Sequence, residues 1–154
     1  MLAIGDSTIL AQHLGLPISD ALVEKLPDGG ERPLPREKFY VPGSVLRAQV
    51  DSSNPLAFGL PSEVDMIFQR SQAFRLDPGA AEQGVEAVAW FGPNSLRSGW
   101  AWGEGYLEDT IAVIDANVGR GKLFLFGPEI AFRAQPHGTW RPQGCGAASG
   151  SSDL

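Results

Sequence analysis

Four side chains that can bind or exchange protons lie close together near the end of the sequence. Glu129, Arg133, Gln135 and His137 alternate with glycine and proline in the segment 127–139. This segment follows an apolar run, 122–126, that predicts a buried strand. Loops placed by rigid strands often carry function, so we predict a ligand-binding or interface loop here. The alternative is a structural loop held by hydrogen bonds to its own backbone. We favour this alternative, because side chains beside glycine and proline turns often serve the architecture of the loop.

A serine and a histidine raise the question of nucleophilic catalysis. Ser7 lies in a sharp turn, 5–8, and His137 is available as its general base. The alternative is that Asp6 or Ser7 caps the helix that follows, and we favour it because Gly-x-Ser turns are common. We therefore predict no catalytic residue in the chain, with Ser7 and His137 as the only candidates.

Metal-binding patterns are absent from the sequence. A hydrolytic zinc needs three protein ligands and a water, yet neither His13 nor His137 is followed by Glu three residues later. The single cysteine, Cys145, excludes a cysteine-rich site and an internal disulfide. The acidic residues Glu104, Glu108 and Asp109 lack the alternating spacing of a calcium loop and indicate a solvated face. We predict no metal and no cofactor in this chain.

Three aromatic residues stand among glycines in the middle of the chain. Trp100, Trp102 and Tyr106 could form a platform for a sugar or a peptide. More often such a cluster fills the space beneath a loop or an interface, and we favour that interpretation.

Charge and hydropathy exclude several kinds of partner. A net charge of −6 and a pI near 4.8 disfavour binding to phosphate backbones. No apolar run is long enough to span a bilayer. The first five residues lack the basic and apolar regions of a signal peptide, and the cellular location stays open.

Short elements must position these residues. Residues 1–4 indicate a strand, and the turn at 5–8 leads into an amphipathic helix through Ile9, Leu10, His13 and Leu14, which is the start of a βα unit in a parallel sheet. A second helix is expected over 20–26 and a polar loop over 27–37. Further strands are expected over 44–50, 64–68, 73–76, 85–91, 111–117 and 122–126, with a hairpin at Gly119-Arg120-Gly121. The runs 112–114 and 123–126 are apolar on both faces, which is typical of a sheet covered on both sides.

Three stretches also resemble a known family. They are Pro42-Gly43-Ser44-Val45-Leu46-Arg47 with 50–51 and 54–61, then Arg97-Ser98-Gly99-Trp100-Ala101-Trp102-Gly103, and then the segment 127–139. Over residues 2–139 the chain resembles the C-terminal domain of bacterial zinc carboxypeptidases of the carboxypeptidase A type. In those proteins this domain is similar to class I glutamine amidotransferases and follows the zinc peptidase domain.

The resemblance implies a fold and a domain organisation. The expected fold is α/β, a flavodoxin-like three-layer sandwich that is incomplete at its N-terminus and strand-rich in its second half. Residues 1–139 would form this partial amidotransferase-like domain. Residues 140–154, dominated by small residues, are expected to be a disordered low-complexity tail.

The resemblance also implies a role without catalysis. The Cys of active amidotransferases is missing from the turn at 5–8, and Thr139 replaces the Glu that follows their His. The chain would be an accessory domain, and its partner would be the peptidase domain, which holds zinc and removes C-terminal residues from peptides. An incomplete sheet would also self-associate. The alternatives are a small-ligand binding module that uses the His137 loop and Trp100/Trp102, and a Ser7/His137 hydrolase. The resembling proteins are often exported in bacteria.

Overall fold

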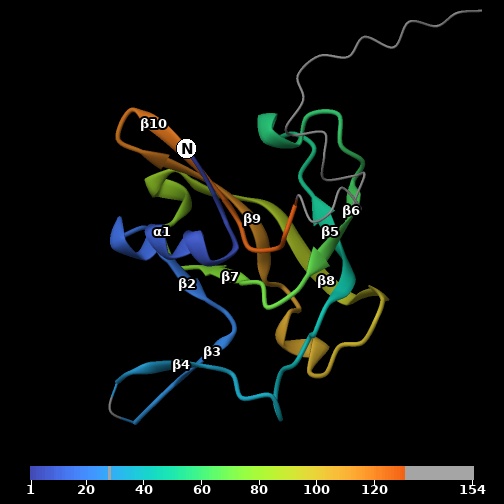
Figure 1. Ribbon diagram of the computed structural model, residues 1–154. Helices are drawn as coiled ribbons and strands as arrows, with labels where there is room; N and C mark the ends of the chain where they lie inside the picture. The colour runs from blue at the N-terminus through green and yellow to red at the C-terminus, as the bar shows by residue number, and fades with distance from the viewer. Residues whose placement is uncertain (28, 131–154) are drawn as a thin grey trace, which may run out of the picture.

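The computed structural model describes residues 1–27 and 29–130, and strands are the main regular structure of this part of the chain (Figure 1). In chain order the strands and the single α-helix are β1 (Leu2–Ile4), α1 (Leu10–His13), β2 (Ile18–Asp20), β3 (Val23–Lys25), β4 (Glu31–Pro33), β5 (Ser44–Val50), β6 (Glu63–Phe68), β7 (Phe74–Leu76), β8 (Val85–Ser98), β9 (Ile111–Val118) and β10 (Gly121–Phe126). Short 3-10 helices occupy Gly5–Ile9, Pro55–Ala57, Ala81–Gln83 and Glu104–Tyr106.

One mixed sheet organises the molecule. Its main path runs β1-β10-β9-β8-β5-β6, and β7 joins β9 while β2 pairs with β7. The pair β1–β10 is parallel, and the other pairs are antiparallel. An isolated bridge between Ile67 and Glu129 connects the end of β6 to the chain that follows β10, so the sheet curls around its interior. The hairpin β3–β4 stands apart.

The expected flavodoxin-like sandwich is wrong. That fold needs long helices that connect parallel strands and cover both sheet faces. In the described part of the chain the only α-helix is α1, which is one turn long, and hairpins join β5 to β6 and β9 to β10. A curled antiparallel sheet can bury one face against itself, so it needs no helical layer. None of the described helices is long and apolar enough to cross a membrane.

The expected helix over 20–26 is also wrong. Those residues end β2 and form β3, whose Val23–Lys25 pair with Glu31–Pro33 of β4. Glu24 forms ion pairs with Arg32 at 2.5 Å and with Lys38 at 2.7 Å. The pair with Arg32 crosses from β3 to β4 and depends on the hairpin. Long-range pairing therefore overrode a weak local helical pattern.

Most of the predicted strands are confirmed. β5 spans the predicted residues, and β6, β7, β9 and β10 differ from the predictions by one residue at an end. The hairpin at Gly119-Arg120-Gly121 joins β9 to β10. The first strand leads through a 3-10 turn into α1, as the βα pattern indicated. The parallel sheet expected around this unit is wrong, since only the pair β1–β10 is parallel.

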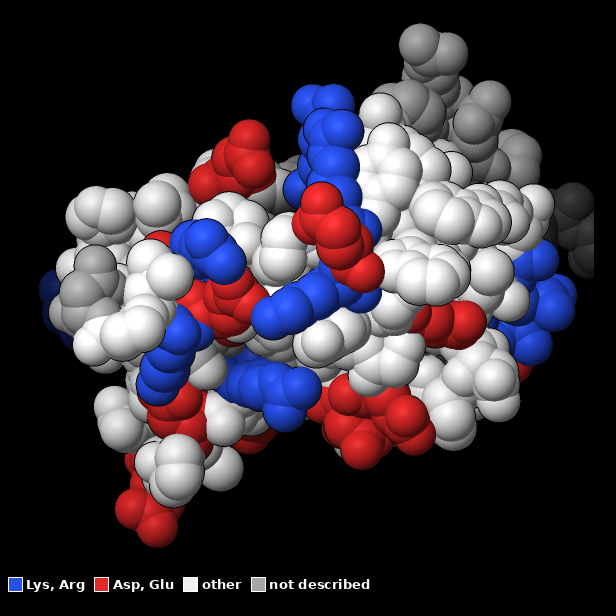
Figure 2. Space-filling model, turned by 90° about the horizontal axis from the view of Figure 1, so that it is seen from below, with Lys and Arg blue, Asp and Glu red and all other residues white. Residues whose placement is uncertain are grey.

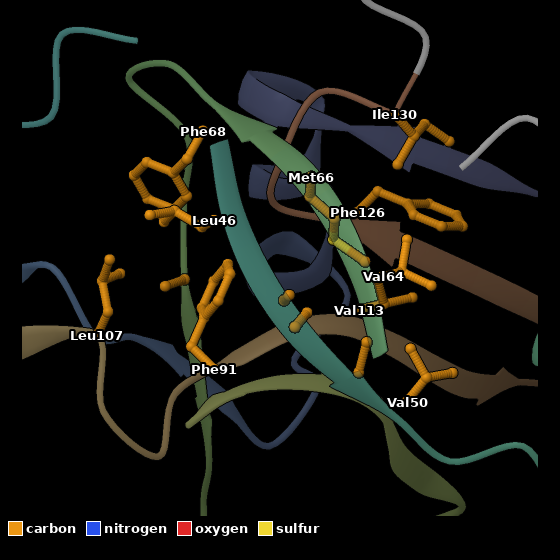
Figure 3. Close-up of a cluster of buried hydrophobic side chains, with 14 of the residues drawn as sticks. Leu46, Val50, Val64, Met66, Phe68, Phe91, Leu107, Val113, Phe126 and Ile130 are labelled. Carbon is orange, nitrogen blue, oxygen red and sulfur yellow. The ribbon is translucent and has the colours of Figure 1, made fainter. Parts of the chain in front are cut away.

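Two apolar clusters lie on opposite faces of β9. The first fills the inside of the curled sheet, where Figure 3 shows the side chains of β5, β6 and β8 pointing toward those of β9 and β10. The second lies between the sheet and α1, β2 and β7. Residues 111–116 of β9 are all buried, which confirms a strand covered on both faces. A small cavity of about 30 Å³ in the first cluster has an apolar lining, so we expect it to be dry.

Candidate functional site

The predicted ligand loop is only partly described. Glu129 is half-buried and its backbone N–H donates to the carbonyl of Ile67 at 3.2 Å. A Cβ atom at Gly5 would lie 3.4 Å from Glu129 Oε1, so this loop begins beside the turn at 5–8. The two meet because β1 and β10 are parallel and end together, with Ile4 paired to Phe126. Arg133, Gln135 and His137 lie outside the described residues, as does the predicted tail, 140–154.

Ser7 stabilises the turn in which it lies. Its exposed hydroxyl accepts the backbone N–H of Ile4 and donates to the carbonyl of the same residue, both at 2.8 Å. Its other candidate role needs His137, which the structure does not describe. Among the described histidines, His13 is exposed and its Nδ1 lies 3.0 Å from the carbonyl of Ile9. Ser7 lies inside the 3-10 helix Gly5–Ile9, and its hydroxyl bonds to the backbone of the residue just before that helix. These contacts stabilise the start of the helix.

An exposed row of aromatic rings forms the first part of the candidate site. We call Tyr40, Trp100 and Trp102 the aromatic ridge. The indole rings of Trp100 and Trp102 are nearly parallel at 21° with centroids 6.5 Å apart, and Tyr40 meets Trp100 edge-on at 5.9 Å. Trp100 is 52% exposed and Trp102 is 53% exposed, so these rings do not fill space beneath a loop. Tyr106 is 41% exposed and makes no ring contact with the ridge within the described residues.

Hydrogen bonds fix the backbone under the ridge. Tyr40 and Trp102 exchange both backbone hydrogen bonds, at 2.9 and 3.0 Å. The Ser44 hydroxyl accepts the N–H of Trp100 at 2.9 Å and donates to its carbonyl at 2.7 Å. The indole N–H of Trp102 donates to the carbonyl of Glu37 at 2.8 Å. Two of the three stretches that carry the family resemblance, 42–47 and 97–103, thus meet at this surface.

Two glycines allow this close approach. Gly99 has φ +99° and Gly103 has φ +74°, in the region that disfavours other residues. A Cβ atom at Gly99 would lie 2.6 Å from Ser44 Oγ, and one at Gly103 would overlap the carbonyl oxygen of Lys38.

A charged cleft adjoins the ridge at Tyr40. We call it the Asp20 cleft; its volume is about 370 Å³, and it lies between the end of β2, the turn after β4 and the turn before β7. Its lining is Asp6, Asp20, Leu22, Pro33, Leu34, Arg36, Phe39, Tyr40, Val41, Phe68, Arg70, Ser71 and Gln72. A second hollow of about 260 Å³, lined in part by Thr8, Ser19 and Glu31, shares Asp20 and Gln72 with it.

The charged groups of this cleft stand apart from one another. Burial raises the pKa of Asp20, the hydrogen bond from the Leu22 N–H at 2.8 Å lowers it, and the nearby charge of Glu31 raises it again. The Arg36 guanidinium lies 5.3 Å from the centre of the Tyr40 ring. Within residues 1–27 and 29–130, neither Arg36 nor Arg70 forms an ion pair, and neither do Asp6 and Asp20. Sequence reasoning missed this cleft because its charges come from separate segments with no shared motif.

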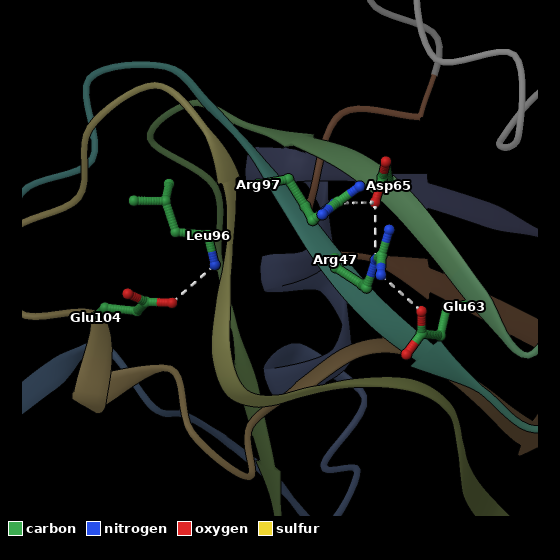
Figure 4. A network of polar contacts seen from close by, with 6 residues as sticks. All are labelled: Arg47, Glu63, Asp65, Leu96, Arg97 and Glu104. Carbon is green, nitrogen blue, oxygen red and sulfur yellow. Dashed lines mark hydrogen bonds and ion pairs between the residues drawn. The ribbon is translucent and has the colours of Figure 1, made fainter.

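The remaining charges on the surface are paired or scattered. Glu104 accepts the backbone N–H of Leu96 at 2.7 Å (Figure 4). Glu108 and Asp109 are exposed. Figure 4 also shows the outer face of β5, where Arg47 lies 2.8 Å from Glu63 and 3.3 Å from Asp65, which Arg97 approaches to 3.6 Å. Acidic and basic side chains are interleaved on the face in Figure 2. In the described residues no three His, Cys, Asp or Glu side chains are grouped so that they could hold a metal.

Comparisons of the chain with protein-family models and with curated proteins find no match. The resemblance to zinc carboxypeptidases therefore rests on the three stretches alone, and the function is inferred from the geometry of the ridge and the cleft.

Proposed function

We propose that this chain is a non-catalytic binding module and that the aromatic ridge binds an extended peptide segment. The observation that carries the proposal is the pair of exposed, nearly parallel indole rings at residues 100 and 102. Ser44 fixes the backbone of Trp100, and the carbonyl of Glu37 accepts the indole N–H of Trp102. Rings that are already ordered lose little conformational freedom on binding, so their contact area contributes directly to affinity.

The spacing of the rings favours an extended peptide as the ligand. Side chains on one face of an extended peptide repeat about every 6.6–6.8 Å, because each residue advances about 3.3–3.4 Å. The ring centroids of Trp100 and Trp102 are 6.5 Å apart. A polyproline II segment repeats after three residues, about 9.3 Å, and fits the pair less well. Two apolar side chains at positions i and i+2 can thus each contact one indole ring.

A peptide titration tests the proposal. A soluble peptide that alternates leucine with serine should shift the indole N–H resonances of Trp100 and Trp102. The W100A and W102A variants should each weaken binding up to about tenfold, the size of an aromatic contact of about 0.5–1.5 kcal/mol. The matched control is Trp90→Phe, because Trp90 lies away from the ridge and bonds to Gln49 at 2.9 Å.

The outcomes of this titration are distinct. Equal binding by W100A and the unchanged protein would refute the ridge as the site. If a β-linked glucose oligomer bound to the ridge and the peptide did not, the ridge would remain the binding site, but the proposal that its ligand is a peptide would be refuted.

A second candidate is the accessory role in a zinc carboxypeptidase-like protein. It is favoured because the stretches 42–47 and 97–103, which resemble that family, build the ridge. In this case the ridge would pack against the peptidase domain, which would hold the zinc and cleave peptides. Calorimetry with the peptidase domain of such a protein should then show binding that W102A weakens. Stoichiometric zinc in the purified chain would contradict the proposal that the peptidase domain, and not this chain, holds the zinc.

A further inference from the structure

A third hollow lies where β5 begins and where β6 and β8 end. Its volume is about 270 Å³, and its lining includes Ser44, Val45, Ile67, Ser98 and Gly99. The register of the sheet places three of these residues side by side, since Val45 pairs with Ile67 of β6 and with Ser98 of β8. We call this feature the Val45 hollow.

The Val45 hollow adjoins the aromatic ridge through the backbone of Trp100. Ser44, which lines the hollow, accepts the N–H of Trp100 at 2.9 Å and donates to its carbonyl at 2.7 Å. Gly99, which also lines the hollow, directly precedes Trp100 in the chain. The wall of the hollow therefore continues into the first tryptophan of the ridge.

The hollow and the ridge lie on the same side of the segment 39–46. Phe39 and Val41 pack with the cluster inside the curled sheet, so Tyr40 between them is directed outward. Leu46 belongs to the same cluster, and Val45 before it is directed outward for the same reason. A ligand that lies along the outside can thus contact Tyr40 of the ridge and the floor of the hollow together.

The chemistry of the hollow favours an uncharged, apolar group. The side chains of Val45 and Ile67 are half-buried, and no ionisable residue belongs to the lining. A charged group that entered would lose solvation without a partner of opposite charge, whereas an aliphatic group would gain from its removal from water. The volume is below that of pockets for drug-sized ligands and suits a single side chain.

The place of the hollow in the chain continues the spacing of the ridge. Ser98 stands two residues before Trp100, as Trp100 stands two residues before Trp102. Side chains on one face of an extended peptide advance about 6.6–6.8 Å for every two residues. A peptide that places two side chains on the tryptophan rings therefore reaches the hollow with the next side chain on the same face.

We propose that the Val45 hollow is a third subsite for the peptide that the ridge binds, and that it selects an uncharged aliphatic side chain two residues beyond the pair on the rings. This inference rests on the proposed peptide-binding function, and it specifies the ligand as an extended peptide with three alternating apolar residues.

Titration of the intact chain with four peptides of equal length tests the subsite. The first peptide has three leucines that alternate with serines; in the second and third, one or the other terminal leucine is replaced by serine, and in the fourth both are replaced by aspartate. We expect the three-leucine peptide to bind about tenfold more tightly than the two-leucine peptides, and the aspartate peptide to bind more weakly than any of these. Only the three-leucine peptide should shift the side-chain amide resonances of Gln69, which also lines the hollow.

Two variants locate the effect in the hollow. Ile67→Ser removes half of the apolar floor, and Ser98→Leu adds a side chain that occupies the space, so either variant should bind the two-leucine and three-leucine peptides equally. The matched control is Ile9→Ser, at an isoleucine that is 53% exposed and lies outside this lining, which should keep the tenfold difference. Thermal unfolding verifies that each variant is folded, and Ser98→Leu alters an exposed position that is expected to tolerate it.

The outcomes separate the subsite from the ridge. Equal binding of the two-leucine and three-leucine peptides by the unchanged protein, with both weakened in W100A, would refute the subsite and leave the ridge supported. Equal effects of Ile67→Ser and Ile9→Ser, or tight binding of the aspartate peptide, would also refute the subsite. No binding of any of the peptides would refute both proposals.

Discussion

At the scale of single residues, the most constrained charge is Asp115 on β9. This side chain is 3% exposed, its Oδ2 lies 2.7 Å from the Lys122 ammonium group, and its Oδ1 is buried without a hydrogen bond in the described part of the chain. Removal of one partner from such a pair leaves an uncompensated charge in the interior. The pair therefore links β9 to β10, and loss of the Lys122 ammonium group would leave the buried Asp115 carboxylate without a counter-charge.

We predict that Lys122→Met lowers the free energy of unfolding by about 1–3 kcal/mol, the usual penalty for an unpaired buried group. Chemical denaturation measures the change. The control is Arg120→Met in the same hairpin, at an exposed arginine that forms no ion pair with the residues that the structure describes, for which a change within about 0.5 kcal/mol is expected. If both substitutions had the same effect, hairpin propensity and not the buried charge would explain it.

A second residue-scale prediction concerns Asp20 and pH. Burial raises the pKa of this carboxyl above its ordinary value of 3.8, so the folded protein binds its proton more tightly than the unfolded chain does. Its contribution to stability is therefore fully present below pH 3.8 and is lost as pH rises through the folded pKa. As pH rises from 3.8 through the folded pKa of Asp20, the thermal unfolding midpoint of the Asp20→Asn variant should therefore fall less steeply than that of the unchanged protein. Parallel midpoint curves for the two proteins would show that Asp20 does not titrate with folding.

At the scale of elements, the ridge depends on the contact between two segments that are not neighbours in sequence. Gly103 allows Trp102 to pair with Tyr40, since a side chain at position 103 would overlap the Lys38 carbonyl oxygen. The sequence predicted β5 well because its apolar and polar residues alternate from Leu46 to Val50. It missed the second half of β8, where Gly92, Pro93 and Asn94 resemble a loop and where the register with β5 shifts.

We predict that Gly103→Ala separates the two segments and broadens or shifts the indole N–H signals of both ridge tryptophans. The free energy of unfolding should fall by at least about 1 kcal/mol, because alanine is strained at positive φ and also clashes. The control, Gly105→Ala, has open space around its Cβ and no positive φ, so it should preserve the spectrum. Identical spectra for the two variants would contradict the role of Gly103.

At the scale of the whole molecule, β9 couples the two apolar clusters. Ala112 and Val113 belong to the cluster inside the curled sheet, while Ile114 and Ala116 belong to the cluster under α1. Because one strand is shared, loss of either cluster should expose apolar surface of the other.

We therefore predict one cooperative unfolding transition. Leu46→Ala in the first cluster and Ile114→Ala in the second should each lower its midpoint by an amount equivalent to about 2–5 kcal/mol. Tryptophan fluorescence and far-UV circular dichroism should report the same midpoint for each variant. Two separate transitions, each sensitive to one substitution only, would show that the clusters unfold independently.

Local sequence was enough to predict β5, β6, β7, β9 and β10, the first turn and the last hairpin, because alternation of residues and turn chemistry act between near neighbours. Ser44–Val50 and Ile111–Val118 are recognisable without any partner. That these strands are mostly antiparallel and curl around their own core follows from long-range pairing, which no local pattern contains. The tertiary structure also brought Asp20, Arg36 and Arg70 to one cleft and Tyr40 to Trp100, because such neighbours are set by the path of the whole chain and by no local pattern.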